Sequence, residues 1–364
     1  ISEIFGEHMQ FDVVVGNPPY VAKRKITSYT YSGFYTNDLP DIYAPCVERA
    51  TDITHAGGRL AMILPISSQF GNDFVLLREY LDSHFSGLWV SAFSRNPSAL
   101  FSAGLGVRST IVVGSRSTSE TCRSFTKTHR WVDGFRPALF ETLQYFELSE
   151  TRLGSDWARP TSLELTQVLE GLLSHGARLG QSVVSTGSHS LGFKQTTLYY
   201  LSVFDEDPPA FELDCSPTQQ PQVSRISFDS ETLADAALAV LLSKLSLVWW
   251  YCTGDDFHTT QDGLKRLPVS VEGLPKQTIA ALSQVGTQIR DRLPDHVMFT
   301  KYAGKWMGNY VISELRDLTD RADEILAAQF GYRENLDALE HAYFCVFKPT
   351  GDRPGTLRES PCKK

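Results

Sequence analysis

The sequence predicts an α/β protein whose first region is a parallel, doubly wound sheet. Short apolar runs, of the kind buried on both faces of a parallel sheet, recur along the first 115 residues. Segments with helical periodicity separate them, and strands that alternate with helices form βαβ units. The apolar runs are at residues 11–16, 59–65, 87–94 and 109–115.

Local signals define the elements of this region. The run FDVVVG (11–16) ends as a strand because the two prolines that follow have no N–H to donate. A helix is predicted between residues 39 and 54, where apolar side chains recur at helical spacing, and the glycines at 57–58 end it. A second amphipathic helix covers residues 74–85. Ligands of such sheets bind at the carboxyl ends of the strands, which is where Asn17 lies.

The pattern changes in the second half of the chain. Periodicity weakens between residues 116 and 160, so we expect a domain boundary near residue 150. Loops and short strands then lead to a largely buried helix over 232–251 and an amphipathic helix over 310–331 that ends at Gly331. The expected parts are a first domain over 1–150, a mixed α/β domain with C-terminal helices over 151–347, and a flexible tail over 348–364.

Composition limits the class of protein. The 364 residues suggest two or three domains, and 42% hydrophobic with 21% charged residues is typical of a soluble globular protein. No apolar run is long enough to cross a membrane and no signal peptide opens the chain, so we expect a cytoplasmic protein with no membrane partner. The six cysteines are scattered, which favours reduced thiols over disulfides or zinc. The net charge of −8 argues against a strongly basic nucleic-acid binder but leaves room for a local basic groove.

Residues 17–20, Asn-Pro-Pro-Tyr, carry the clearest chemical signal. The amide oxygen of Asn17 and the carbonyl oxygen of Pro18 are two acceptors, and proline rigidity fixes where the second points. Two converging acceptors suit an –NH2 group, whose lone pair then faces an electrophile. Tyr20 offers a flat face on which a base can stack, worth about 1–3 kcal/mol. The alternative is a rigid turn at the end of a strand.

FDVVVGNPPYV resembles the (D/N/S)PP(Y/F/W) motif of amino-methyltransferases, in the form seen in Eco57I-like adenine-N6 DNA methyltransferases of restriction–modification and defence systems. DIYAPCVERA and HAGGRLAMILPISSQF look like the helix and strand that follow this motif. NPSALFSAGLGVRSTIVVG looks like a later motif in which an aromatic residue precedes a β-hairpin. The resemblance covers residues 11–115 well and residues 150–345 loosely, through FHTTQDGLKRLPV and ISELRDLTDRADEIL.

This resemblance implies a partial Rossmann-like methyltransferase sheet followed by a mixed α/β target-recognition domain with C-terminal helices. It implies that S-adenosyl-L-methionine is the methyl donor and that the acceptor is N6 of an adenine flipped out of double-stranded DNA. The matching catalytic residues are Asn17, Pro18, Pro19 and Tyr20, and the base-stacking residues are Tyr20 and Phe101, with Phe93 as the competitor of Phe101.

The cofactor motif of the family is missing. Its Gly-rich turn should precede NPPY by tens of residues, yet only 16 residues precede Asn17, and Gly6 is the only glycine among them besides Gly16. We therefore expect the C-terminal portion of such an enzyme, which binds S-adenosyl-L-methionine weakly or not at all. Asn17 and Pro18 would be its only cofactor contacts, and an upstream methylase or nuclease segment its partner.

Three segments carry side chains able to contact DNA. A basic run directly follows Asn17–Tyr20, which we call the amine clamp, and a loop beside a base pocket is well placed for phosphate contacts. GFKQTT and DDFHTTQDGLKR contain side chains that can hydrogen-bond to base edges or phosphates. The alternative for each is an ordinary solvated loop, and we expect no metal at Asp255, Asp256 and His258. The expected DNA-contacting residues are Lys23, Arg24, Lys25, Lys194, Gln195, His258, Gln261 and Lys265.

Two other functions are compatible with the same residues. A clamp for –NH2 does not depend on what carries the amine, so protein glutamine or RNA is an alternative substrate, although the long C-terminal region favours DNA. A third hypothesis is a non-catalytic DNA-recognition module, in which NPPY has no catalytic role because the cofactor motif is absent.

Overall fold

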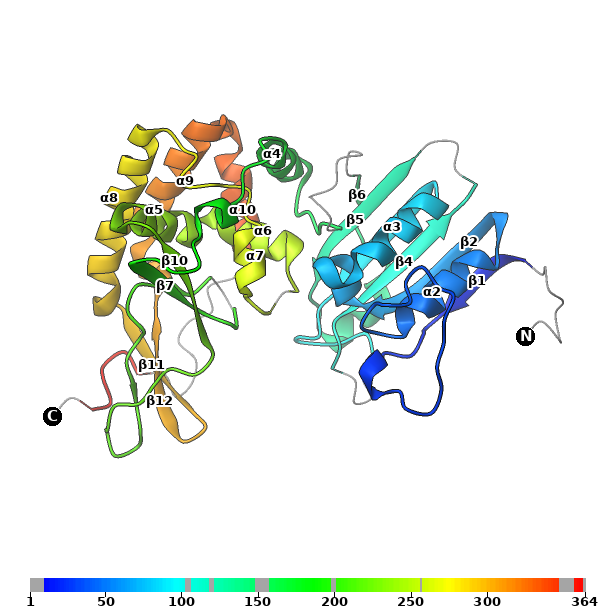
Figure 1. The fold of residues 1–364 in the computed structure, drawn as a ribbon, viewed down its shortest axis with the longest axis horizontal. Helices are drawn as coiled ribbons and strands as arrows, with labels where there is room; N and C mark the ends of the chain where they lie inside the picture. Colours follow the sequence, from blue (N-terminus) through cyan, green and yellow to red (C-terminus); the bar gives the residue numbers. More distant parts are fainter. Residues whose placement is uncertain are drawn as a thin grey trace. The chain divides into compact units, whose positions relative to one another are not determined.

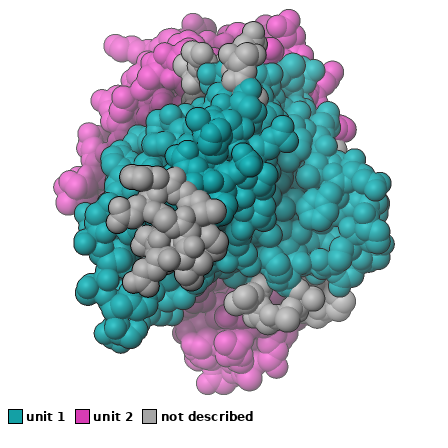
Figure 2. Space-filling view, turned by 90° about the vertical axis from the view of Figure 1, so that its right-hand side faces the viewer, with its two compact units in different colours: residues 1–166 teal, residues 167–364 magenta. Residues whose placement is uncertain are grey.

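The chain forms two compact units, residues 1–166 and residues 167–364 (Figure 2). A computed structural model describes residues 10–101, 106–117, 121–147, 157–197, 201–255, 257–346 and 357–362. The division falls within helix α4 (Leu163–Ser174), whereas the sequence placed the boundary near residue 150.

Unit 1, residues 1–166, is built on one six-stranded sheet (Figure 1). In spatial order its strands are β1 (Phe11–Gly16), β2 (Thr54–Pro65), β4 (Ser109–Ser115), β3 (Gly87–Phe93), β5 (Cys122–His129) and β6 (Phe146–Glu147). β1 is parallel to β2 and β3 is parallel to β5, but β4 lies antiparallel between β2 and β3. The predicted parallel sheet is therefore a mixed sheet, because an apolar run marks a buried strand without recording its direction.

β1 and β5 of unit 1 differ from what the sequence predicts. β1 was predicted to be buried on both faces, yet Val13 is 61% and Val15 73% exposed. The two side chains lie on the same face of β1, because successive side chains of a strand alternate between its faces, and the described residues leave that face uncovered. β5 was not predicted, since its run is polar. Its hydroxyl residues Ser124 and Thr126 are nevertheless buried, and Thr126 Oγ1 accepts a hydrogen bond from the Ala92 N–H of β3.

Two α-helices pack against this sheet, α2 (Tyr43–Asp52) and α3 (Val75–His84), and they contact one another (Figure 1). The buried Tyr43 ring stacks on Phe74 with 4.9 Å between ring centroids. Both helices lie within the residues predicted for them, but α2 ends at Asp52, and Gly57 and Gly58, which were expected to end it, lie inside β2. The short 3-10 helices of unit 1 are η1 (Lys23–Lys25), η2 (Ile66–Gln69), η3 (Asn72–Phe74) and η4 (Asp133–Ala138).

Unit 2, residues 167–364, combines two small sheets with a helical core (Figure 1). One sheet has the order β10 (Val223–Phe228), β7 (His189–Lys194), β8 (Val203–Phe204), and the other has the order β11 (Val297–Tyr302), β12 (Lys305–Tyr310), β9 (Ala210–Phe211). The helices are α5 (Glu231–Leu242), α6 (Lys244–Thr253), α7 (Gln261–Lys265), α8 (Lys276–Arg292), α9 (Arg316–Phe330) and α10 (Leu336–Val346), with the 3-10 helices η5 (Leu179–Ser182), η6 (Leu293–Asp295), η7 (Ile312–Leu315) and η8 (Arg333–Asn335).

The long helix predicted over 232–251 is two helices. Ser243 has an extended backbone, and its hydroxyl accepts a hydrogen bond from the Ser246 N–H, which caps α6. α5 and α6 meet at a bend of 64°. No single helix among the described residues is long and apolar enough to cross a membrane, and only this bent pair meets the length and composition required. α9 ends as predicted, at Gly331 with φ +76°.

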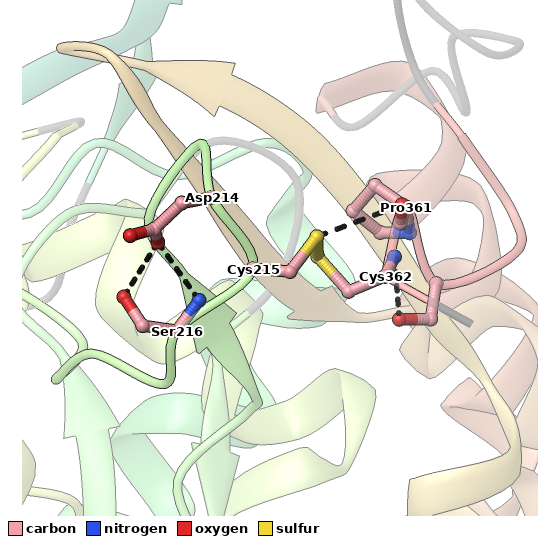
Figure 3. Close-up of a disulfide and its surroundings, with 6 residues drawn as sticks. Asp214, Cys215, Ser216, Pro361 and Cys362 are labelled. Carbon is pink, nitrogen blue, oxygen red and sulfur yellow. Dashed lines mark hydrogen bonds between the residues drawn. A yellow bond between two sulfur atoms is a disulfide. The ribbon is translucent and has the colours of Figure 1, made fainter. Parts of the chain in front are cut away.

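The C-terminal segment is joined to unit 2 by a disulfide between Cys215 and Cys362 (Figure 3). This bond contradicts the expectation that all the thiols are reduced. The two cysteines are 147 residues apart in the sequence, so their spacing gave no signal of the pairing. Leu357 also exchanges backbone hydrogen bonds with Phe299 of β11. Residues 357–362 belong to the tail that was expected to be flexible. They are held at one end by the hydrogen bonds of Leu357 and at the other by the disulfide of Cys362.

Candidate functional site

Four strands of unit 1 end along one edge of the sheet. β1, β2, β3 and β5 run in the same direction, so their carboxyl ends lie together, and β4 begins there. We call this the carboxyl edge. Residues 17–20 follow β1 and the connection 94–108 joins β3 to β4, so both segments start from this edge. β1 and β4 are two strands apart, about 10 Å at the usual strand spacing.

The acceptor residues stand at the end of β1. Asn17 and Pro19 are exposed and Pro18 is half-buried, which leaves the amide of Asn17 accessible. Gly16 before them is paired with Met62 of β2, and a Cβ at Gly16 would lie 2.9 Å from the Met62 sulfur. The strand end is therefore held close against β2, and the prolines carry that rigidity into the acceptors.

Tyr20 is fixed at both its hydroxyl and its ring. The hydroxyl donates a hydrogen bond of 2.9 Å to the carbonyl oxygen of Ile63, and the ring meets the buried Tyr43 edge-on, with 6.3 Å between centroids. Burial raises the pKa of Tyr20 to about 12, so the phenol stays protonated and keeps donating. The ring is half-buried rather than free in solvent. This side chain is preorganised before any ligand arrives.

The three cations of η1 differ in their contacts: one is bonded to a neighbouring loop of the protein and two are exposed. The Lys23 ammonium donates to the Asn37 carbonyl at 2.5 Å, lies 3.7 Å from Asp38 and stands over the Tyr31 ring. Arg24 and Lys25 are exposed. Of the three predicted DNA contacts in this run, the exposed pair is the better placed to meet phosphate.

The connection after β3 decides between the two candidate aromatics. Phe93 is fully buried in a cluster with Trp131 and Leu139, so it has no open face for a base. Phe101 is 38% exposed and lies beyond the cis peptide bond between Asn96 and Pro97. The geometry therefore favours Phe101. Residues 102–105 lie outside the described residues.

The loops of unit 2 that were predicted to contact DNA come together. Thr196 pairs with His258, and the Thr259 N–H donates to the Gln195 carbonyl at 2.9 Å. The Gln261 amide donates to the Arg225 carbonyl of β10 at 3.4 Å. Gln195, His258 and Gln261 are thereby gathered beside β7 and β10, and we call them the unit 2 loop cluster. The proximity of Arg225 was not predicted, because only the pairing of β10 with β7 reveals it.

The two predicted lysines of unit 2 are less available. The Lys194 ammonium donates to the Gly308 carbonyl at 3.0 Å and to Asn309 Oδ1 at 2.6 Å, so it braces β12. Burial lowers its pKa to about 8, against the attraction of Asp207. Lys265 is half-buried and its stem packs on the backbone of Gly180.

His258 forms a hydrogen bond with Asp255 through Nδ1, while Asp256 lies outside the described residues. Within the part of the chain that the structure describes, no group of three or more His, Cys, Asp or Glu side chains could hold a metal ion.

Comparison with known proteins bears on both units. Residues 1–90, which contain Asn17–Tyr20, match the model of the Eco57I restriction-modification methylase family. No curated protein matches the chain. The chain is similar to the Type IIL restriction-modification enzyme MmeI, solved in complex with DNA, at 12% identity and a TM-score of 0.52, over 92% of this chain and 57% of that one. This likeness shows that the two proteins share a fold.

Two further structures are similar to parts of the chain. A nuclease-deletion mutant of the Type ISP restriction-modification enzyme LlaGI, in complex with a DNA substrate mimic, has 11% identity and a TM-score of 0.42, over 77% of this chain and 41% of that one. DrdV in a DNA complex has 18% identity and a TM-score of 0.34, over 41% of this chain and 18% of that one. The chain thus spans between about a fifth and somewhat more than half of the length of these enzymes.

Proposed function

We propose that this chain carries the catalytic and target-recognition parts of a restriction–modification DNA methyltransferase that methylates the exocyclic N6 amino group of adenine. The observation that carries the proposal is the rigid set of residues at the end of β1. An accessible amide and a proline carbonyl stand beside a tyrosine ring that is already fixed in place. The family match over residues 1–90 supports methylation as the reaction class.

The roles of these residues follow from their chemistry. The Asn17 amide oxygen and the Pro18 carbonyl oxygen accept the two hydrogens of the amino group, which leaves the nitrogen lone pair free to attack. The Tyr20 ring stacks on the base, and Phe101 closes the pocket from the connection that returns to the sheet at β4, about 10 Å from β1. The amine nitrogen is itself the nucleophile, so no covalent enzyme intermediate forms. Positioning and polarisation of the amine supply the rate.

The methyl donor we propose is S-adenosyl-L-methionine, which supplies an electrophilic methyl group. Among the described residues, Asn17 and Pro18 are the ones we assign to its site, and their oxygen acceptors fit a cationic sulfonium centre. They lie at the carboxyl edge, where ligands of α/β sheets bind. Their part in catalysis is to hold the amine and orient its lone pair.

Double-stranded DNA with a flipped adenine is the proposed partner. The exposed Arg24 and Lys25 lie seven and eight residues beyond Asn17 and suit phosphate contacts. The unit 2 loop cluster gathers two amides and an imidazole, side chains that hydrogen-bond to base edges. We assign sequence recognition to this cluster and chemistry to unit 1.

The test is methyl transfer by the natural protein in which this chain occurs. Labelled S-adenosyl-L-methionine is offered with unmethylated genomic DNA, with RNA and with protein extract, and the modified product is identified after hydrolysis. We expect N6-methyladenine in DNA. Label found only in glutamine or RNA contradicts the DNA assignment, and methylcytosine contradicts the choice of adenine.

Substitution of Asn17 tests the clamp itself. Asn17→Ala removes one of two acceptors and should lower methyl transfer by at least about 100-fold, comparable to the loss of one catalytic hydrogen-bonding group. Asn17→Asp keeps acceptor oxygens and should retain more activity than Asn17→Ala. Circular dichroism and the unfolding temperature should match the wild type in both, because the side chain is exposed. An active Asn17→Ala protein would rule out the clamp.

A further inference from the structure

The connection 94–108, which carries Phe101, is hydrogen-bonded at both of its ends to neighbouring segments of unit 1. The Ser94 N–H donates to the His129 carbonyl of β5 at 2.9 Å, and the Arg108 carbonyl accepts from the Ile66 N–H at 2.9 Å. Arg95 donates to the Gly106 carbonyl at 3.1 Å, which links the two ends of the connection. These bonds fix where the connection leaves the sheet and returns to it, but they do not reach its outer part.

One side chain from a distant segment holds the outer part. The Arg136 guanidinium, from η4, donates to the Leu100 carbonyl at 2.8 Å and to the Ala99 carbonyl at 2.9 Å. Asp133 accepts a further hydrogen bond of 3.0 Å from the same guanidinium and so orients it. The two carbonyls belong to the residues directly before Phe101. A guanidinium can bond both at once because its donors form a planar fork.

Packing around this segment is incomplete. Leu100 packs against the cluster of Phe93, Trp131 and Leu139. Beside it lies an open cavity of about 340 Å³ that Pro97 lines together with Phe135 and other residues of segment 129–142. Because Pro97 borders this hollow, part of the connection lacks close packing, and the hydrogen bonds from Arg136 contribute to the position of its outer part.

We infer that Arg136 is a positioning residue for the aromatic face that Phe101 presents to the flipped base. This inference rests on the proposed function and extends it to a residue that contacts neither base nor cofactor. By fixing the two preceding carbonyls, Arg136 limits the backbone freedom of Phe101 before the base arrives. A preorganised ring loses less conformational entropy on stacking. Arg136 thus acts on the chemistry through Phe101.

A double-mutant cycle tests this coupling. The variants are Arg136→Met, Arg136→Lys, Phe101→Ala and the pair Arg136→Met with Phe101→Ala. Arg49→Met serves as the control, because Arg49 is an exposed arginine of the same unit on α2. Initial rates of methyl transfer to unmethylated genomic DNA give kcat and KM for each, and thermal unfolding is followed in parallel.

Arg136→Met should lower kcat about tenfold, the effect expected from losing charge-assisted hydrogen bonds, with a much smaller change in KM. Phe101→Ala should lower kcat by a similar factor. In the Phe101→Ala background, Arg136→Met should cost less than about twofold more, because coupled residues are not additive. Arg136→Lys should fall between wild type and Arg136→Met, since one ammonium can bond one carbonyl well. Arg49→Met should behave as wild type.

Several outcomes overturn the inference. Equal losses from Arg136→Met in both backgrounds would mean that Arg136 supports the fold and not Phe101. No loss in the single variant, or full activity of Phe101→Ala in an enzyme that methylates DNA, would reject the positioning role while the proposed function stands. A wild-type protein that transfers no methyl group to DNA would reject the proposed function, and the inference with it.

Discussion

The proposed catalytic residues of unit 1 and the unit 2 loop cluster are assembled in opposite ways. Asn17 to Tyr20 are consecutive, and their relative geometry comes from two prolines and one strand end. Gln195 comes from a segment more than 60 residues away from that of His258 and Gln261, and the two segments meet through backbone pairing and through the hydrogen bond of the Gln261 amide to Arg225. Under the proposed function, the residues assigned to chemistry are adjacent in the sequence, whereas those assigned to recognition come from separate loops.

The two regions each use one lysine for structure, and unit 1 also has exposed cations beside its proposed catalytic residues. Lys23 of unit 1 and Lys194 of unit 2 both donate to backbone carbonyls of a neighbouring segment, so each braces its own unit. Arg24 and Lys25 beside the clamp remain exposed. Substitutions should therefore separate residues that act on chemistry, on recognition and on stability.

After the loss of Asn17, the largest effect should come from the Tyr20 ring. Tyr20→Ala removes the stacking face and should lower methyl transfer by about 5- to 150-fold, the equivalent of about 1–3 kcal/mol for one stacked base. Tyr20→Phe keeps the ring and should lower the rate far less. It should lower the free energy of unfolding by about 1 kcal/mol, because the bond to the Ile63 carbonyl is lost. If Tyr20→Phe is as inactive as Tyr20→Ala, the hydroxyl and not the ring is what catalysis needs.

The unit 2 loop cluster should affect recognition without affecting the chemical step. Gln195→Ala or Gln261→Ala should relax the preference for the target sequence by about 1–3 kcal/mol if the amide reads a base, with kcat at saturating DNA unchanged. Competition binding with target and non-target duplexes measures this. Gln277→Ala, an exposed glutamine on α8, is the matched control. A loss of kcat in the loop variants would contradict the assignment of recognition to unit 2 and of chemistry to unit 1.

Stability should depend on pH differently in the two units. Burial lowers the pKa of His129 in unit 1 to about 4, with Lys127 acting in the same direction, and burial lowers that of Lys194 in unit 2 to about 8. In each case the folded state binds fewer protons than the unfolded state, so stability rises with pH between the two pKa values. His129 should therefore destabilise unit 1 as pH falls from about 6.5 towards 4, and Lys194 should add stability to unit 2 as pH rises from about 8 towards 10.5.

Denaturant unfolding of wild type, His129→Gln and Lys194→Met across this pH range measures these contributions. Each difference from wild type should change by on the order of 1 kcal/mol, in the acid range for His129 and in the alkaline range for Lys194. Lys276→Met, an exposed lysine on α8, should change neither profile. A Lys194→Met profile parallel to wild type above pH 8 would place that ammonium in solvent.

The smallest effect should be in the salt dependence of DNA binding. Arg24→Ala and Lys25→Ala should each reduce the slope of log K against log salt by about 0.9, the value for one phosphate contact. Lys23→Ala should reduce it less, because its ammonium is already bonded to Asn37. Titration of duplex DNA at several salt concentrations gives the slopes. Equal slopes for all three variants would mean that Lys23 leaves its protein contacts to meet DNA.

Much of the architecture was readable from the sequence. β1 and β4 lie at the residues predicted, because continuous apolar runs mark strands, although only β4 is buried as expected. α2, α3 and α9 follow from apolar periodicity, and Gly331 ends α9 because a left-handed residue favours glycine. The proposal for residues 17–20 also comes from the sequence alone, since two consecutive prolines and a flanking amide and ring are chemically unusual at a strand end. These features depend on residues that are neighbours in the chain.

The tertiary structure decided what depends on residues far apart. The direction of β4, the break between α5 and α6, and the disulfide from Cys215 to Cys362 left no periodic trace in the sequence. Only the fold shows that Phe93 is buried while Phe101 is exposed, that Lys194 braces β12, and that Arg136 reaches the carbonyls before Phe101. The physical reason is that local sequence sets backbone preference and apolar pattern, whereas the partner of a side chain is chosen by three-dimensional packing.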